Sequence, residues 1–357
     1  MFLRNIVKDK KNNCFPPRYI VLVLFSLRIM CDNNTAHLTS YGYDDRYKDM
    51  ALTQNQETAV LIIAYNRPEY LIQCIKSIEQ NPESQELIFI FALDGGSQSK
   101  QDENIDLINQ ATIKHKIILR RNRNYGCPKN HIDSQRFAFE WCKFKKVILM
   151  QEDIIVTPSY FTFMLNLHAW ATNTYDNIAA VQSWTKCYLT AEQKKDRLDH
   201  VQEDRQYWSF VTYCLDSICW QEIRSILYGY ENFVDQIPHT DEYARARSKP
   251  HLWKGADDIR QWAYDIVRSK TQKKVSLPST LKSATKYLSR LNLCEDEMMG
   301  FAFCIKDLVK ITSVVNRVRH IGEHGISTNK GQYDRLYQNV HLDLFPEDKI
   351  IKTFQLL

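Results

Sequence analysis

No CxxC pair occurs among the ten cysteines of this 357-residue chain, and no zinc-ligand spacing is present, so a structural zinc site is not expected. The net charge of +5 is too small to indicate nucleic-acid binding. Hydrophobic residues make up 44% and charged residues 25%, ordinary values that argue against a disordered chain and against a polytopic membrane protein. No internal repeat is found. The chain is therefore expected to be globular and long enough for one large α/β domain.

Long apolar segments are also scarce, and a single one is a candidate membrane anchor. It covers residues 19–30 behind a basic leader, but Arg28 interrupts it, and a spanning helix needs about 20 apolar residues. Two interpretations stay open: a signal peptide or short signal anchor, or a buried N-terminal element of a soluble protein. Residues 1–57 are treated as an N-terminal tail with a candidate single anchor. A type II Golgi or endoplasmic-reticulum membrane protein is favoured over a cytoplasmic one.

From residue 58, short apolar runs alternate with segments of helical periodicity. The runs end in polar or glycine-containing turns and lie at residues 59–64, 87–93, 116–119, 147–150 and 178–181. This alternation predicts βαβ units, and hence an α/β fold in which a mainly parallel sheet is covered by helices on both faces. Helices are expected after residue 68, from about 131 to 142, from Thr157 as N-cap to about 170, and over 218–227. Beyond residue 190 the pattern loosens.

Polar residues stand where the predicted strands end. Arg67 follows the first run, Asp94 the second, and the Glu152-Asp153 pair the fourth. Parallel sheets bind ligands at the carboxyl ends of their strands, so these side chains are expected to meet in one site. Each also has a simpler interpretation. Arg67 could cap its turn or form a surface ion pair. Asp94 could serve only to stabilise the turn before two glycines, and Glu152-Asp153 could lie in solvent at the end of its strand.

Taken together, these segments resemble the GT-A glycosyltransferases, in particular N-acetylglucosaminyltransferase I of family 13 and its bacterial family-2-like relatives. The likeness rests on residues 61–71, on the turn at 94–96, on the Glu152-Asp153 pair, on an Asn-x-Gly-Cys turn at 124–127 and on the segment 317–327. It covers roughly residues 58–342, with a poorly matched stretch at 190–290.

The resemblance implies a Rossmann-like GT-A fold. Residues 58–190 would bind the nucleotide sugar, and residues 191–345 would form a looser acceptor-binding and catalytic half. The Asn-Arg-Pro turn and the aspartate after the second strand hold the uridine in that family, which implies this role for Arg67 and Asp94. The same likeness places Glu152 in the nucleotide site. The implied partners are a UDP-sugar donor and a glycan or glycoprotein acceptor, with no nucleic acid.

A divalent cation is implied as well. The acidic triplet of the family ends in the aspartate that binds the metal, and here it reads Gln151-Glu152-Asp153, so the metal position falls on Asp153. His320 resembles a late-loop histidine that ligates metal in related transferases; an ordinary hydrogen-bonded loop histidine is the alternative. Sugar transfer from a nucleotide diphosphate needs a cation on the departing phosphate, a role that Mn2+ or Mg2+ can fill. By strand alternation, the Glu152 and Asp153 side chains are expected to point apart.

Transfer also needs a base that deprotonates the acceptor hydroxyl. Glu295 and Asp296 are the candidates, and they resemble an acidic pair on the acceptor side of the family, with Cys294 in place of its tryptophan. Which of the two acids is the base stays open. The alternative is that they only form the charged first turn of a helix, where the helix dipole favours acidic residues.

The sequence thus indicates a metal-dependent glycosyltransferase, with N-acetylglucosamine favoured as the transferred sugar by resemblance alone. A nucleotidyltransferase is less well supported, because such enzymes carry a glycine-rich loop after the first strand and residues 65–68 contain no glycine. A non-catalytic homologue that binds a glycan or a partner is the third interpretation, motivated by Gln151 and Cys294.

Overall fold

The structure is a computed structural model, and it describes residues 57–185, 189–205, 210–235, 255–271, 295–324, 330–337 and 351–357. The candidate anchor at residues 19–30 lies outside these ranges. Within them, no helix is both long enough and apolar enough to cross a membrane.

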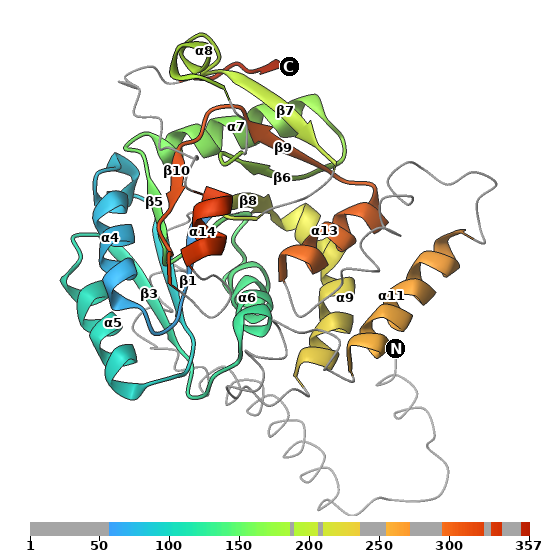
Figure 1. Ribbon diagram of the computed structural model, residues 1–357, viewed down its shortest axis with the longest axis horizontal. Helices are drawn as coiled ribbons and strands as arrows, with labels where there is room; N and C mark the ends of the chain where they lie inside the picture. Colours follow the sequence, from blue (N-terminus) through green and yellow to red (C-terminus); the bar gives the residue numbers. More distant parts are fainter. Residues whose placement is uncertain are drawn as a thin grey trace, which may run out of the picture.

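Nine strands in the described part of the chain form one sheet, in the order β11-β7-β9-β6-β8-β4-β1-β2-β3 (Figure 1). They are β1 (Thr58–Ala64), β2 (Ile88–Leu93), β3 (His115–Arg120), β4 (Lys146–Gln151), β6 (Ile178–Gln182), β7 (His200–Asp204), β8 (Tyr213–Asp216), β9 (Val309–Ser313) and β11 (Gln355–Leu356). The four strands β3, β2, β1 and β4 are parallel neighbours, and β8 runs antiparallel between β4 and β6. The predicted α/β fold with a mainly parallel sheet is confirmed, and strands from both sides of residue 190 pair within it.

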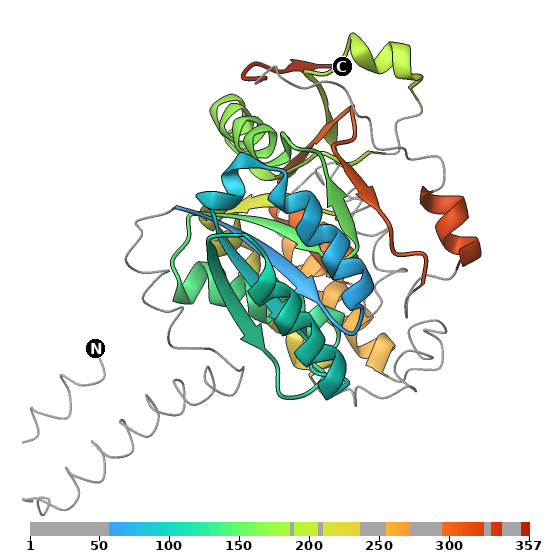
Figure 2. The same cartoon turned by 90° about the vertical axis from the view of Figure 1, so that its left-hand side faces the viewer.

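Helices cover both faces of this sheet. One face carries α4 (Pro68–Glu79), α5 (Gln98–Gln110) and α7 (Tyr160–Thr174), and the core on the other contains α6 (Cys127–Arg136), α9 (Ser217–Val234), α11 (Gly255–Thr271) and α13 (Glu295–Lys306). Figure 1 shows α4 and α5 on one side of the strands and α6, α9 and α13 on the other, and Figure 2 views the sheet from the α4 and α5 side. Because side chains alternate along a strand, β1 contributes Val60 and Ile62 to the first core and Leu61 and Ile63 to the second. Burial on both faces explains the unbroken apolar runs of the sequence.

The helix after β3 starts earlier than predicted. Helix α6 begins at Cys127 rather than near residue 131, and a π-helical turn (Phe137–Trp141) follows it. Gly126 permits this start, since its φ of 75° lies in the left-handed region that glycine adopts without strain. Pro128 stands in the first helical turn, where its missing N–H needs no partner. As a result, Cys127 lies at the carboxyl edge of the parallel strands.

Helix α7 starts later than predicted. Ser159 is its N-cap and Tyr160 its first residue, so the N-cap predicted at Thr157 is wrong by two residues. Thr157 belongs instead to the turn that leads into the helix. Its backbone N–H donates to the carbonyl oxygen of Arg317 at 3.0 Å, and its own carbonyl accepts the N–H of Tyr160. This turn ties the start of α7 to a segment near the other end of the chain.

A separate two-stranded sheet lies beside the end of β4. Strand β5 (Ile154–Val156) pairs antiparallel with β10 (Val318–His320), so that His320 lies opposite Ile154. The remaining short helical elements are η1 (Pro82–Gln85), α8 (Ala191–Lys195) and α14 (Lys330–Tyr337). The pairing of β5 with β10 places His320 and the loop that follows β10 beside the acid pair that follows β4.

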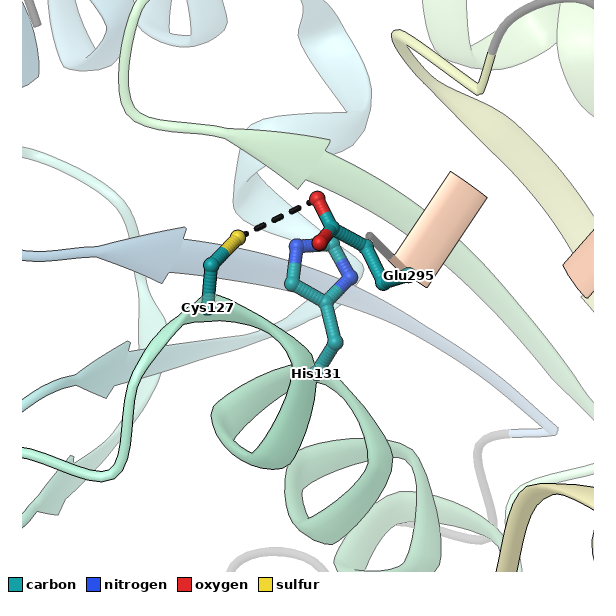
Figure 3. A group of neighbouring side chains, drawn as sticks. All are labelled: Cys127, His131 and Glu295. Atoms are coloured by element: carbon teal, nitrogen blue, oxygen red, sulfur yellow. Dashed lines mark hydrogen bonds between the residues drawn. The ribbon is translucent and has the colours of Figure 1, made fainter. Parts of the chain in front are cut away.

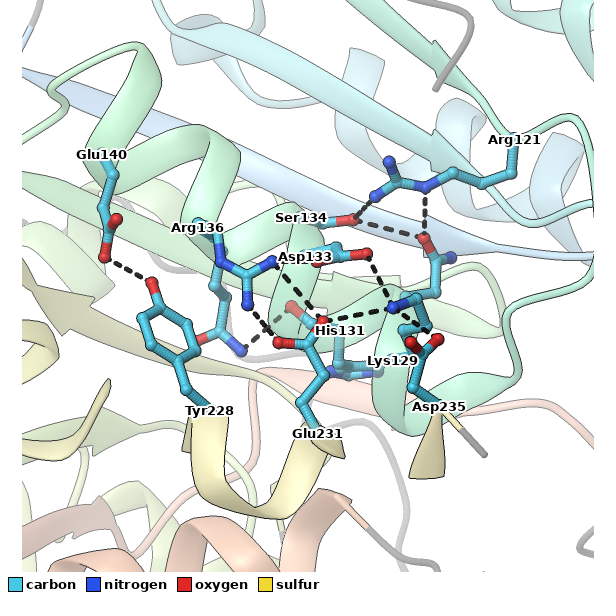
Figure 4. A network of polar contacts seen from close by, with 12 residues as sticks. Arg121, Lys129, His131, Asp133, Ser134, Arg136, Glu140, Tyr228, Glu231 and Asp235 are labelled. Carbon is cyan, nitrogen blue, oxygen red and sulfur yellow. Dashed lines mark hydrogen bonds and ion pairs between the residues drawn. The ribbon is translucent and has the colours of Figure 1, made fainter. Parts of the chain in front are cut away.

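A network of charged side chains joins α6 to α9 (Figure 4). The ammonium of Lys129 lies 3.3 Å from Glu231 and 2.9 Å from Asp235, and Arg136 pairs with both Glu231 and Asp133. Burial raises the pKa of Glu231. The side chain of Glu231 is only 11% exposed, so removing it would leave two cations without the carboxylate that they share. The network therefore holds the start of α6 in a defined position on α9.

Candidate functional site

The chain turns at Glu152 and Asp153, between β4 and β5. Strand β4 ends at Gln151, so strand alternation no longer governs these two residues, and the prediction that their side chains point apart is wrong. Both contact one guanidinium. Arg67 donates from Nε to Glu152 Oε1 at 2.6 Å, and its Nη1 lies 2.9 Å from Asp153 Oδ2. Glu152 Oε2 also accepts the backbone N–H of Tyr65 at 2.6 Å, which closes the turn after β1 onto the acid pair.

Burial shapes the electrostatics of this group. Glu152 is 1% exposed and Asp153 is 3% exposed. Burial raises the pKa of Glu152 to about 7, although Arg67 opposes the rise. For Arg67, burial alone would lower the pKa, but the neighbouring Asp153 and Glu152 outweigh it, so the pKa lies above its ordinary value. The guanidinium therefore stays charged between the two acids.

The Asp153 carboxylate has capacity for a further ligand. Its Oδ1 is buried and makes no hydrogen bond within the described residues, while its Oδ2 lies near Arg67 and 3.5 Å from Nε2 of His320. A Cβ added to Gly322 would lie only 2.2 Å from Oδ2, so the loop can pass this close only with glycine. A buried oxygen without a donor is costly unless a cation or a water serves it. The unpaired Oδ1 therefore fits a divalent cation.

His320 is held firmly beside Asp153. Its ring stacks on Tyr337 of α14, with centroids 4.4 Å apart and 11° between the planes, and its carbonyl accepts the hydroxyl of Tyr333 at 2.8 Å. Its Nδ1 accepts the backbone N–H of Gly322 at 3.3 Å, which leaves the ring proton on Nε2. Burial lowers the pKa of His320, so the ring is neutral at pH 7. Coordination through Nε2 therefore requires the bond from Gly322 to break.

Asp94 organises the loop between β3 and α6. Its Oδ1 accepts the backbone N–H of Gly95 at 2.9 Å and that of Tyr125 at 2.7 Å. In the same loop, the amide of Asn124 donates to the hydroxyl of Tyr65 at 2.9 Å. The backbone of Tyr65 also donates to Glu152, so Tyr65 links the loop that Asp94 holds to the acid pair.

The stability of the protein should depend on pH through Asp94. Burial raises the pKa of Asp94 to about 6 from an ordinary 3.8, so the folded protein retains a proton that the unfolded chain releases. The contribution of Asp94 to wild-type stability should therefore fall as the pH rises from about 4 to about 6, by up to about 3 kcal/mol, and then level off. Asp94→Asn keeps the Oδ1 acceptor and does not titrate, so its stability relative to wild type should increase over this range. Denaturant unfolding at several pH values measures the difference, and a constant difference would contradict the shift.

At the start of α13, Glu295 reaches the start of α6 (Figure 3). The thiol of Cys127 donates to Glu295 Oε1 at 3.1 Å, and His131 follows one helical turn later. Potential ligand atoms of these three residues all lie within 4.8 Å of one another. Glu295 is 7% exposed, whereas Asp296 is half-buried. Both acids stand in the first turn of α13, so a role as charged helix start is compatible with a role as base.

The structure thus gathers the predicted residues into two sets. In the first set, Arg67 contacts both Glu152 and Asp153, and His320 lies against Asp153. Asp94 and Glu295 form the second set, because the loop held by Asp94 leads into the turn of α6 that contacts Glu295. The candidate role of each residue in nucleotide, metal or acceptor binding stays a prediction.

Two features were not predicted from the sequence. Cys127 and His131 were not grouped with Glu295, although their four-residue spacing on a helix was a usable signal. Arg317, part of the resemblance, is 1% exposed and donates to Ser313 and to the carbonyl of Leu198, which indicates a structural role. The remainder of that motif, from residue 325, lies outside the described residues.

No family model matches the sequence, and the search of curated proteins found no match. Several solved structures are similar in fold. A mannosyltransferase from Pyrobaculum calidifontis in complex with GDP-Man and Mn2+ is 9% identical, with 76% of this chain and 83% of that one covered and a TM-score of 0.38. S. aureus TarS 1–349 is 8% identical, with 71% and 91% covered and a TM-score of 0.36. The galactosyltransferase LgtC, in complex with donor and acceptor sugar analogs, is 14% identical, with 50% and 66% covered and a TM-score of 0.28. Similarity this low does not decide a function, which must be argued from the side chains.

Proposed function

We propose that the protein is a metal-dependent glycosyltransferase that uses a nucleotide-diphosphate sugar. The observation that carries this proposal is the buried carboxylate of Asp153 at the end of β4. Its Oδ1 makes no hydrogen bond within the described chain, and the guanidinium of Arg67 already lies on Oδ2. The group therefore attracts positive charge at the edge of the sheet where parallel α/β proteins bind nucleotides. The sequence likeness to GT-A glycosyltransferases supports the same activity.

Asp153 would hold the cation, and His320 would join it once its bond from Gly322 is broken. Mn2+ accepts both carboxylate oxygen and imidazole ligands, whereas Mg2+ favours oxygen alone. The bound cation would supply positive charge that stabilises the departing diphosphate. Arg67 lies close enough to contribute a second positive charge to the same phosphates.

The donor and acceptor follow from the resemblance and from the position of the acids. We favour a UDP-sugar, with N-acetylglucosamine as the transferred group, and a glycan or glycoprotein as acceptor. The turn after β2, which contains Asp94, would contact the uridine. Either Glu295 or Asp296 would accept the proton of the attacking hydroxyl group. The Golgi or endoplasmic-reticulum location and the N-terminal anchor are proposed from the sequence alone.

Calorimetry with UDP tests the nucleotide site. UDP should bind more tightly in Mn2+ than in EDTA by about 5–150-fold, the usual range of coupling between two ligands. Affinity for UDP that does not depend on metal, or no affinity, would contradict the proposal. A screen of UDP- and GDP-sugars for Mn2+-dependent hydrolysis then identifies the donor. Metal-dependent binding without hydrolysis or transfer of any donor would instead identify a non-catalytic homologue.

A further inference from the structure

A second group of potential metal ligands lies apart from the acid pair. It consists of the thiol of Cys127, the imidazole of His131 and the carboxylate of Glu295, and Figure 3 shows the three side chains facing one another. The four-residue spacing places Cys127 and His131 on one face of α6, and the start of α13 brings in Glu295 from a distant part of the chain. One sulfur, one nitrogen and one oxygen therefore meet in a small volume.

The spacing of these atoms suits a single small ion. Zinc binds sulfur at about 2.3 Å and nitrogen or oxygen at about 2.0–2.2 Å, so tetrahedral ligand atoms lie roughly 3.3–3.6 Å apart. In the structure, the sulfur of Cys127 lies 3.1 Å from Glu295 Oε1, and no pair among the three ligand atoms exceeds 4.8 Å. Small side-chain rotations would bring all three to ligand distance. Three protein ligands leave the fourth position to water.

We propose that Cys127, His131 and Glu295 form a binding site for a thiophilic divalent cation, represented by Zn2+, separate from the Mn2+ site at Asp153. Thiolate and imidazole ligands favour Zn2+, whereas Mn2+ favours oxygen ligands, so the two sites should select different metals. When Zn2+ binds, the S–H bond of Cys127 breaks, its proton leaves to solvent, and the sulfur donates its electron pair to the metal. The hydrogen bond from the thiol to Glu295 is replaced by a bond from the carboxylate to zinc.

The fold holds two of these ligands in place before any ion arrives. Cys127 is the first residue of α6, and the charge network of Lys129 and Arg136 with Glu231 fixes that helix on α9 (Figure 4). His131 is 2% exposed, so its ring has little freedom to turn away. Rigid placement of ligands lowers the entropy that binding would otherwise cost.

Occupation of this site should inhibit the enzyme, an effect that rests on the proposed function. Glu295 is a candidate base, and a carboxylate that binds Zn2+ cannot accept a proton from the acceptor. Micromolar Zn2+ should therefore inhibit transfer, and excess Mn2+ should not restore it, because Mn2+ does not compete well for a thiolate. Inhibition that Mn2+ relieves would place the zinc at Asp153 and contradict the proposal.

The decisive experiment uses Co2+ as a spectroscopic probe for Zn2+ on the full chain. Wild-type protein should show a thiolate-to-cobalt charge-transfer band that Zn2+ abolishes, and Zn2+ binding should release one proton, measured by calorimetry in buffers of different ionisation enthalpy. Cys127→Ser should remove the band and weaken Zn2+ binding by at least about 100-fold, since even indirect partners of ligands change affinity 10–100-fold. Cys142→Ser, which replaces another half-buried cysteine, is the matched control and should retain the band.

The variants also distinguish this site from the Mn2+ site. Asp153→Ala should keep the cobalt band, and Glu295→Gln, which preserves the shape of the side chain, should weaken Zn2+ binding even if Cys127→Ser fails to fold. Absence of the band in wild type, or unchanged Zn2+ affinity in Glu295→Gln, would overturn the proposal. These measurements do not require turnover, so they decide the metal site even if no glycosyl transfer is found.

Discussion

Asp153→Ala is expected to eliminate the Mn2+-dependent part of UDP binding, a loss of at least about 100-fold in the affinity for Mn2+ measured with UDP present. Asp153 offers the buried Oδ1 that makes no hydrogen bond in the described chain, and alanine offers no oxygen in its place. The Arg67 guanidinium keeps Glu152 as a partner in the variant, so the fold should survive the change.

Three further variants make this result specific. Glu323→Ala is the matched control, because Glu323 lies in the same loop as Gly322 and pairs with Lys330 at the surface. It should leave Mn2+ binding unchanged. His320→Ala should weaken binding moderately, since His320 must break a hydrogen bond before it can coordinate, and Glu152→Gln should have a smaller effect. Full Mn2+ binding by Asp153→Ala would disprove the assignment of Asp153 as a metal ligand. Unchanged Mn2+ binding in His320→Ala would remove only His320 from the proposed ligands.

Replacement of the base should abolish transfer without affecting donor binding. Glu295→Gln is expected to lower the transfer rate by about 10²–10⁴-fold, the usual contribution of a general base. The affinity for the UDP-sugar should stay nearly unchanged, because a base acts on the acceptor hydroxyl. Glutamine keeps an oxygen that can accept the hydrogen bond from Cys127, so the packing of α13 on α6 should be preserved.

Asp296→Asn measured in parallel decides between the two acids. If Asp296→Asn lowers the transfer rate and Glu295→Gln does not, the base is Asp296, the half-buried second acid of α13. Single-turnover rates and donor affinities of both variants should be compared with those of wild type. Near-normal turnover in both would show that the base lies elsewhere and that the acids serve only as a helix start.

The sheet could be predicted largely from local pattern. The apolar runs in β1, β2, β3, β4 and β6 are visible because the apolar side chains on both faces of these strands are buried. Strand β8 (Tyr213–Asp216) could not be predicted in this way, since it has four residues and leads directly into α9. Its antiparallel place between β4 and β6 depends on pairing with residues far away in the sequence.

The candidate site was predictable in its residues but less so in its geometry. Strand-end positions identified Arg67 and Asp153, but not the ion pair between them, because the chain turns at Glu152 instead of continuing the strand. The proximity of His320 to Asp153 depends on the register of β5 with β10. Likewise, the contact between Cys127 and Glu295 depends on how α13 packs against α6. Local periodicity contains none of this long-range information.

Under the proposed function, the Arg67 guanidinium would couple metal binding to nucleotide binding. In the free protein the Arg67 guanidinium neutralises Asp153. A metal cation that arrives without a nucleotide must therefore compete with the positive charge of Arg67 for the Asp153 carboxylate. A diphosphate changes this balance, because its oxygens offer both positive groups new partners. Metal and nucleotide should therefore enter together, and each should bind weakly without the other. In the proposed enzyme, Arg67 would return to Asp153 when the nucleotide leaves, so that the protein's own counter-charge would close the metal position after each turnover.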